Sequence, residues 1–108
     1  MQETPALVTN MQGKLGAFLL KPGKRFLLGR EKNCDIVLAD ISISRAHAEV
    51  FPGPEGLYIR DLQSSNGVQV NHTKIDSPYH LTSGDSIILG NITLYFVDHR
   101  PRKAQLPV

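Results

Sequence analysis

Glycine and proline recur at short intervals along this chain, which leaves little room for long helices. The sequence holds nine glycines and seven prolines, and they extend from Pro5 to Pro107. The segments between them are short and apolar, and the whole chain contains eight isoleucines and seven valines. β-Branched residues favour strands, and short strands separated by turn residues are typical of sandwiches and barrels. The pattern therefore predicts an all-β domain.

Turn residues place several of the strands. Residues 16–20 and 25–29 flank Lys21-Pro22-Gly23-Lys24, where proline at the second position and glycine at the third predict a type II turn. Residues 87–89 and 92–94 flank Gly90-Asn91, and glycine at the first position of a two-residue loop predicts a type II′ hairpin. Further strands are expected at residues 7–8, 48–51, 57–61, 68–71 and 74–75.

Residues 30–51 contain neither glycine nor proline, and their pattern is ambiguous. Several apolar residues between Ile36 and Val50 recur near helical spacing, but Val37, Leu38 and Ile41 do not share that face. The β-branched content argues against a helix. We therefore expect a short strand at residues 36–38, an irregular loop, and a strand that begins at His47.

The length and composition fit one soluble domain without cofactors. The chain has 108 residues, of which 41% are hydrophobic and 20% charged. Its single cysteine, Cys34, excludes an internal disulfide and a cysteine-rich zinc site, and its four histidines do not pair at metal-ligand spacing. The longest apolar run is four residues, so we expect no membrane span, no secretory signal and a cytoplasmic location.

Charge separates the domain from a short tail. Residues 1–97 carry nine Lys or Arg and nine Asp or Glu, so they are neutral. Residues 98–108 add three basic residues and one acidic residue, which gives the chain its net charge of +2. A nucleic-acid binder needs a clustered basic face, so no nucleic-acid partner is expected. We interpret residues 1–97 as the domain and residues 98–108, with Pro101 and Pro107, as a linker segment.

Three polar groups lie between the apolar segments, and each has a simple structural explanation on its own. Arg30 follows Gly29 at a strand end, Ser44 precedes His47 by three residues, and residues 64–67 read Ser-Ser-Asn-Gly. A serine near a histidine is also compatible with a hydrolase. However, the sequence supplies no orienting acid and no oxyanion hole, so a structural hydrogen bond is favoured. Nucleotide-binding glycine loops are absent as well, and we expect no enzymatic activity and no catalytic residue.

Taken together and in order, these groups resemble the forkhead-associated (FHA) domain family. The matching segments are residues 29–30 (GR), 35–40 (DIVLAD), 43–47 (ISRAH), 61–71 (DLQSSNGVQVN), 81–85 (LTSGD) and 88–90 (ILG). The resemblance covers residues 4–97, and Val68 stands where the family often has threonine. It implies an SMAD/FHA-like β-sandwich of about eleven strands, with loops at one end that bind phosphothreonine peptides.

The resemblance also implies a role for each matching residue. Arg30 and Ser44 would bind the phosphate directly, and Arg45 would add a phosphate or peptide contact. Ser65 would close the pocket from the facing loop, and Asn66 would hydrogen-bond the peptide backbone. The supporting residues would be Gly29, His47 and Gly67, with His47 bracing the loops.

Elementary chemistry agrees with these roles. A phosphate dianion presents three acceptor oxygens, and an arginine fork matches them. An asparagine carboxamide both donates and accepts, which suits an extended peptide backbone. The expected function is a monomeric, phosphothreonine-dependent binding module in Ser/Thr-kinase signalling. The alternative is the same fold used for phosphate-independent protein interaction.

Overall fold

The computed structural model describes residues 4–11 and 13–98 of the chain. Within these residues the backbone forms eleven strands and no helix, which confirms the predicted all-β fold. The strands are β1 (Ala6–Met11), β2 (Lys14–Leu19), β3 (Phe26–Gly29), β4 (Ile36–Val37), β5 (Ala48–Gly53), β6 (Gly56–Asp61), β7 (Val68–Val70), β8 (Thr73–Lys74), β9 (Tyr79–His80), β10 (Ser86–Leu89) and β11 (Ile92–Val97). None of the described residues forms a helix that could cross a membrane. The linker expected at residues 98–108 lies outside the described residues beyond Asp98.

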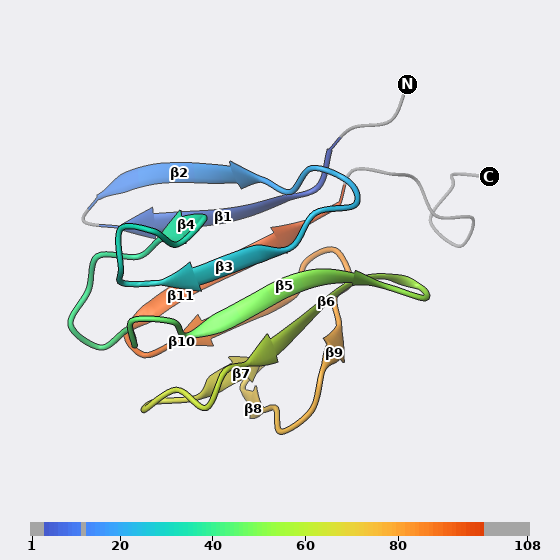
Figure 1. Ribbon diagram of the computed structural model, residues 1–108. Coiled ribbons are helices and arrows are strands. Elements are labelled where there is room, and N and C mark those ends of the chain that lie inside the picture. The colour runs from blue at the N-terminus through green and yellow to red at the C-terminus, as the bar shows by residue number, and fades with distance from the viewer. Residues whose placement is uncertain (1–3, 12, 99–108) are drawn as a thin grey trace.

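The strands form two stacked sheets (Figure 1). The six-stranded sheet has the order β2-β1-β11-β10-β7-β8, and the five-stranded sheet has the order β4-β3-β5-β6-β9. Neighbouring strands are antiparallel except β3 and β4, which run parallel. The loops that follow β3, β4 and β6 lie at the same end of the sandwich as the β10–β11 turn (Figure 1). This end is where the candidate site residues gather.

The turns have the backbone conformations that the sequence predicts. Gly23 has a φ of 74° at the third position of its turn, as a type II turn requires. Gly90 has a φ of 56° while Asn91 is not in the left-handed region, which agrees with a type II′ hairpin between β10 and β11. Asn71 and His72 both have positive φ, 51° and 71°, and form a type I′ turn between β7 and β8. Local turn chemistry therefore sets the register of the β10–β11 and β7–β8 hairpins, and it turns the chain from β2 in one sheet to β3 in the other.

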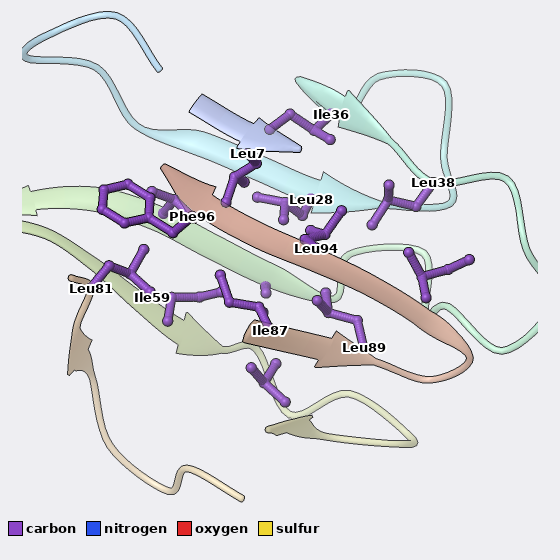
Figure 2. Packing of buried hydrophobic residues seen from close by; sticks show 14 of the residues in the cluster. Leu7, Leu28, Ile36, Leu38, Ile59, Leu81, Ile87, Leu89, Leu94 and Phe96 are labelled. Atoms are coloured by element: carbon purple, nitrogen blue, oxygen red, sulfur yellow. The ribbon is translucent and has the colours of Figure 1, made fainter. Parts of the chain in front are cut away.

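The core lies between the two sheets, where alternate residues of strands such as β5, β10 and β11 face inward (Figure 2). On β11, Leu94 and Phe96 are buried, and they pack with Leu28 of β3 and Ile59 of β6 in one apolar cluster. Each such side chain contributes about 1.5–3 kcal/mol when it leaves water. The sandwich thus provides a rigid platform for the loops at its end.

The ambiguous window at residues 30–51 differs from the prediction at its edges. Strand β4 ends at Val37, one residue earlier than expected, and β5 begins at Ala48. Between them Leu38 and Ile43 lie in an irregular loop, yet both are buried in the core. Ala39, which fits the helical spacing, is exposed, whereas Leu38, which does not fit it, is buried. The helix-like spacing therefore does not mark the side chains that this loop turns inward. The short strand β9 was not predicted, since it pairs with β6 through only two residues.

Candidate functional site

The β4–β5 loop lies directly on the end of strand β3. A Cβ atom placed on Gly29 would lie only 2.1 Å from the carbonyl oxygen of Arg45, so glycine is required at this contact. The backbone N–H of Arg30 donates to the carbonyl of Ser44 at 3.0 Å, and that of Glu31 donates to the carbonyl of Arg45 at 3.3 Å. These bonds place Arg30 and Ser44, fourteen residues apart in sequence, next to each other.

The guanidinium of Arg30 is anchored at one nitrogen and free at the others. Its Nε–H donates to the carbonyl oxygen of Ile43 at 2.9 Å, while the residue as a whole is exposed. Within the described residues, neither terminal nitrogen takes part in a hydrogen bond or an ion pair. The side chain is therefore held in place with its two-pronged edge available to an anion.

Ser44 connects the β4–β5 loop to the β6–β7 loop. Its hydroxyl oxygen accepts the backbone N–H of Ser65 at 3.0 Å, and its own N–H donates to Nδ1 of His47 at 3.1 Å. The hydroxyl proton of Ser44 has no acceptor among the described residues, so it is available to a ligand oxygen. The structure thus brings Ser44 and Ser65 together, as the sequence comparison with the family implies.

His47 is completely buried, and its ring bonds to both the β4–β5 loop and the β6–β7 loop. Because Nδ1 accepts the N–H of Ser44, the neutral ring carries its proton on Nε2, which lies 2.8 Å from the carbonyl oxygen of Gly67. The ring does not bond the hydroxyl of Ser44, so the two residues are not arranged as nucleophile and base. The structural interpretation of this pair, rather than the hydrolase one, agrees with the geometry.

Asn66 and Gly67 are the last two residues of the β6–β7 loop, directly before β7. The Nδ2 atom of Asn66 donates to the carbonyl of Ser42 at 2.9 Å, and the carboxamide oxygen has no partner among the described residues. Gly67 has a φ of 75°, and its N–H donates to the hydroxyl of Ser64 at 2.9 Å. That hydroxyl donates in turn to a carboxylate oxygen of Asp61 at 2.5 Å. The loop is therefore ordered by its own polar side chains.

A family model, that of the FHA domain, matches residues 26–90, which include every residue of this arrangement. This chain belongs to the FHA domain family. Solved structures agree: the FHA domain of the CT664 protein from Chlamydia trachomatis is 33% identical with a TM-score of 0.84, and the match covers 91% of this chain and 100% of that one. The all-β sandwich is thus the fold of a known interaction domain.

Two further proteins that this chain resembles come from Mycobacterium tuberculosis. The ATP-binding/permease protein Rv1747 is 42% identical over 71 residues, which are 66% of this chain and 8% of that protein. EmbR, solved in complex with a low affinity phosphopeptide, is 29% identical with a TM-score of 0.77, and the match covers 92% of this chain and 25% of EmbR. This chain therefore spans only a small part of the length of these two proteins.

One residue of the expected FHA site is linked to the others only through its backbone. The side chain of Arg45 is exposed, and no hydrogen bond or ion pair engages it within the described part of the chain. Its carbonyl oxygen accepts the thiol of Cys34 at 3.2 Å. Burial raises the pKa of that thiol, so Cys34 stays protonated and serves as a donor.

Two other residues at this end of the FHA domain were not predicted from the sequence. The side chain of Lys74 on β8 runs over Gly67, where an added Cβ would lie 2.9 Å from its Cε. Ser42 contacts both Asn66 and the β10–β11 hairpin. An Asp-x-Ser pattern, which favours a local side-chain-to-backbone bond, is the one signal that marks Ser42 in the sequence.

The cations at the site are not neutralised by neighbouring carboxylates. Both ion pairs found in residues 4–11 and 13–98 involve Glu49, which contacts Arg25 and Arg60 on the outer face of the five-stranded sheet. Arg30, Arg45 and Lys74 take part in neither pair. The loop end of this FHA domain thus presents unpaired positive charge toward solvent, which favours an anionic ligand.

Proposed function

We propose that this FHA domain is a non-catalytic module that binds phosphothreonine peptides. The observation that carries the proposal is the juxtaposition of Arg30 and Ser44. The first offers a free guanidinium fork, the second a free hydroxyl proton, and backbone hydrogen bonds fix both before a ligand arrives. Fixed charged and neutral donors suit the three oxygens of a phosphate dianion.

Asn66 supplies the contact that distinguishes a peptide from a bare phosphate. Its unpaired carboxamide oxygen and its second Nδ2–H face away from the bond to Ser42, so one group can accept and one can donate. An extended peptide backbone offers the matching N–H and C=O groups. Ser65 would close the pocket from the β6–β7 loop, and the exposed charge of Arg45 would add to phosphate or peptide contacts.

The relatives support the same class of ligand. EmbR, which shares this fold, was solved with a phosphopeptide. The expected partner is therefore a protein phosphorylated on threonine by a Ser/Thr kinase, in the cytoplasm. The binding unit comprises residues 1–97, acts as a monomer, and needs neither nucleic acid nor a cofactor.

Calorimetry with a phosphothreonine peptide selected from a degenerate library tests the proposal. Arg30→Ala should weaken binding at least about tenfold, because a charge-assisted bond to a dianion contributes about 1.5–3 kcal/mol. Arg30→Lys should also weaken binding, since a point charge does not replace the fork. Arg60→Ala on the outer sheet face is the matched control and should bind like the parent chain. Binding of Arg30→Ala within about twofold of the parent would refute the site.

A further inference from the structure

Every hydrogen-bonding group of Ser42 is engaged, although this residue lies outside the set that the family resemblance marks. Its N–H donates to a carboxylate oxygen of Asp40 at 2.9 Å, and its hydroxyl donates to the same oxygen. The hydroxyl oxygen accepts the backbone N–H of Asn91 at 2.8 Å, and the carbonyl oxygen accepts Nδ2 of Asn66 at 2.9 Å. Ser42 therefore links three separate segments: its own loop, the β6–β7 loop and the β10–β11 hairpin.

The β10–β11 hairpin lies in close contact with Ser42. A Cβ atom added to Gly90 would lie 2.5 Å from both the carbonyl oxygen and the hydroxyl oxygen of Ser42. Gly90 also has a φ of 56°, which side chains rarely adopt. The two atoms of Ser42 that contact this hairpin tip are thus confined by a neighbour from the other sheet. One of them is the carbonyl oxygen that holds Asn66.

An exposed asparagine carboxamide rotates freely unless a bond fixes it, because its last torsion is broad. In Asn66 the bond from Nδ2 to Ser42 is the one that fixes it. With that bond in place, the carboxamide oxygen and the second Nδ2–H keep one orientation toward solvent. Arg30 is anchored elsewhere, on the carbonyl of Ile43. The anchors of the phosphate contact and of the peptide contact are therefore separate atoms.

We propose that Ser42, held by Asp40 and by the Gly90–Asn91 hairpin, is a positioning residue that orients the carboxamide of Asn66 for the peptide backbone. The role in binding rests on the proposed function, but the orientation itself does not. The hairpin of the six-stranded sheet thus becomes part of the binding end without touching the ligand. Ser42 acts through Asn66 and touches neither phosphate nor peptide.

A ligand-free NMR experiment tests the orientation directly. In the parent chain, the Asn66 side-chain amide should give two well-separated proton signals, one of them slow to exchange with water. Ser42→Ala keeps the carbonyl oxygen that accepts Nδ2 of Asn66, but it removes the hydroxyl bonds to Asp40 and Asn91 that hold this carbonyl in place. In this variant the separation of the two signals should narrow toward that of an unrestrained asparagine, and both protons should exchange quickly. Ser83→Ala is the matched control, because it also removes a serine hydroxyl that accepts a backbone N–H, that of Asp98 at 3.0 Å. It should leave the Asn66 signals unchanged.

A binding cycle then separates positioning from general loop damage. Ser42→Ala should weaken phosphothreonine-peptide binding about fivefold, because the carbonyl that anchors Asn66 loses the hydroxyl bonds that hold it in place. The same substitution should change affinity less than about twofold in an Asn66→Ala background, and keep its full effect in an Arg45→Ala background. Asp40→Asn, which weakens the hold on Ser42, should act in the same direction and serves if Ser42→Ala does not fold.

Two results would overturn the positioning role of Ser42, and a third would separate it from the proposed function. Unchanged Asn66 signals in both the Ser42 and Asp40 variants would overturn the proposal. An equal loss of affinity with and without Asn66 would also overturn it, because Ser42 would then be a general structural residue. If the parent chain binds no phosphothreonine peptide, the proposed function fails, while the NMR comparison still decides whether Ser42 orients Asn66.

Discussion

The Nε2 atom of His47 lies 2.8 Å from the carbonyl oxygen of Gly67, and this bond joins the two loops that carry Ser44 and Asn66. The other ring nitrogen accepts the N–H of Ser44 at 3.1 Å, so the buried ring has a polar partner at each nitrogen. The two loops are therefore held at a fixed distance in the absence of ligand. Preorganisation of this kind lowers the entropy that binding must overcome.

Replacement of His47 by alanine should destabilise the whole domain. Loss of a buried ring and its two hydrogen bonds corresponds to about 3 kcal/mol. For a domain of this size each kcal/mol lowers the melting temperature by about 4–8 °C, so a fall of at least about 10 °C is expected. Thermal unfolding followed by circular dichroism measures it.

Ser44→Ala is the counterpart of that change, since Ser44 is only half-buried and its hydroxyl proton is free for the proposed ligand. Its melting temperature should stay within a few degrees of the parent while phosphopeptide affinity falls. The opposite pattern, with a stable His47 variant and an unfolded Ser44 variant, would contradict this division of roles.

Gly29→Ala should be one of the most destabilising small changes in the chain. The added methyl group would overlap the backbone carbonyl of Arg45, which cannot move without displacing the β4–β5 loop. We expect a loss of at least about 2 kcal/mol in urea unfolding.

Gly16→Ala on strand β2 is the matched control for Gly29→Ala. Nothing lies within 4 Å of the added Cβ at Gly16, and alanine in a strand is favoured over glycine by roughly 0.5–1 kcal/mol. This variant should therefore be as stable as the parent or slightly more so. Equal stability of the two glycine variants would show that the contact between β3 and the loop is not tight.

The hydroxyl and N–H of Ser42 lower the pKa of Asp40 below the ordinary carboxyl value. Since the folded-state pKa is lowered, the ionised carboxylate favours the folded state. That contribution is present above the ordinary pKa and is lost as pH falls through the lowered one. In Ser42→Ala the pKa of Asp40 should rise toward its ordinary value, as measured by NMR titration of its carboxyl carbon. An identical titration of Asp40 in both chains would contradict the bond to Ser42.

The all-β fold was predictable because the turn residues and the short apolar segments between them indicate the same structure. Glycine at the third position of residues 21–24 and at the first position of the 90–91 loop specifies the turns, and both turns form as expected. The region around Leu38 and Ile43 was harder. Those side chains are buried by tertiary packing in an irregular loop, so no period of two or 3.6 describes them.

The candidate site was predictable only in part, because tertiary packing that the sequence pattern does not show brings some of its residues together. The motif residues Arg30, Ser44 and Asn66 stand out because, taken together and in order, they match the pattern of the FHA family. Ser42 and the Gly90–Asn91 hairpin do not, because their contact joins residues 49 positions apart and depends on how the two sheets stack. The roles assigned to the motif residues remain predictions for the binding experiments.

Discrimination between phosphothreonine and phosphoserine should come from packing. In the proposed site, Arg30 and Ser44 would contact only the phosphate, which phosphothreonine and phosphoserine have in common. The threonine methyl group would then have to make the difference. The loops around Ser44 and residues 65–67 are expected to leave a recess for it. Filling such a recess contributes roughly 1–3 kcal/mol, or about ten- to two-hundredfold in affinity.

Fluorescence anisotropy on three peptides of one sequence, carrying phosphothreonine, phosphoserine or unmodified threonine, tests the central claim most directly. We predict binding of the phosphothreonine peptide, at least about tenfold weaker binding of the phosphoserine peptide, and no measurable binding of the unmodified one. Equal affinity for the two phosphopeptides would remove the methyl recess. Equal binding of the unmodified peptide would contradict phosphate-dependent recognition and establish the phosphate-independent alternative in its place.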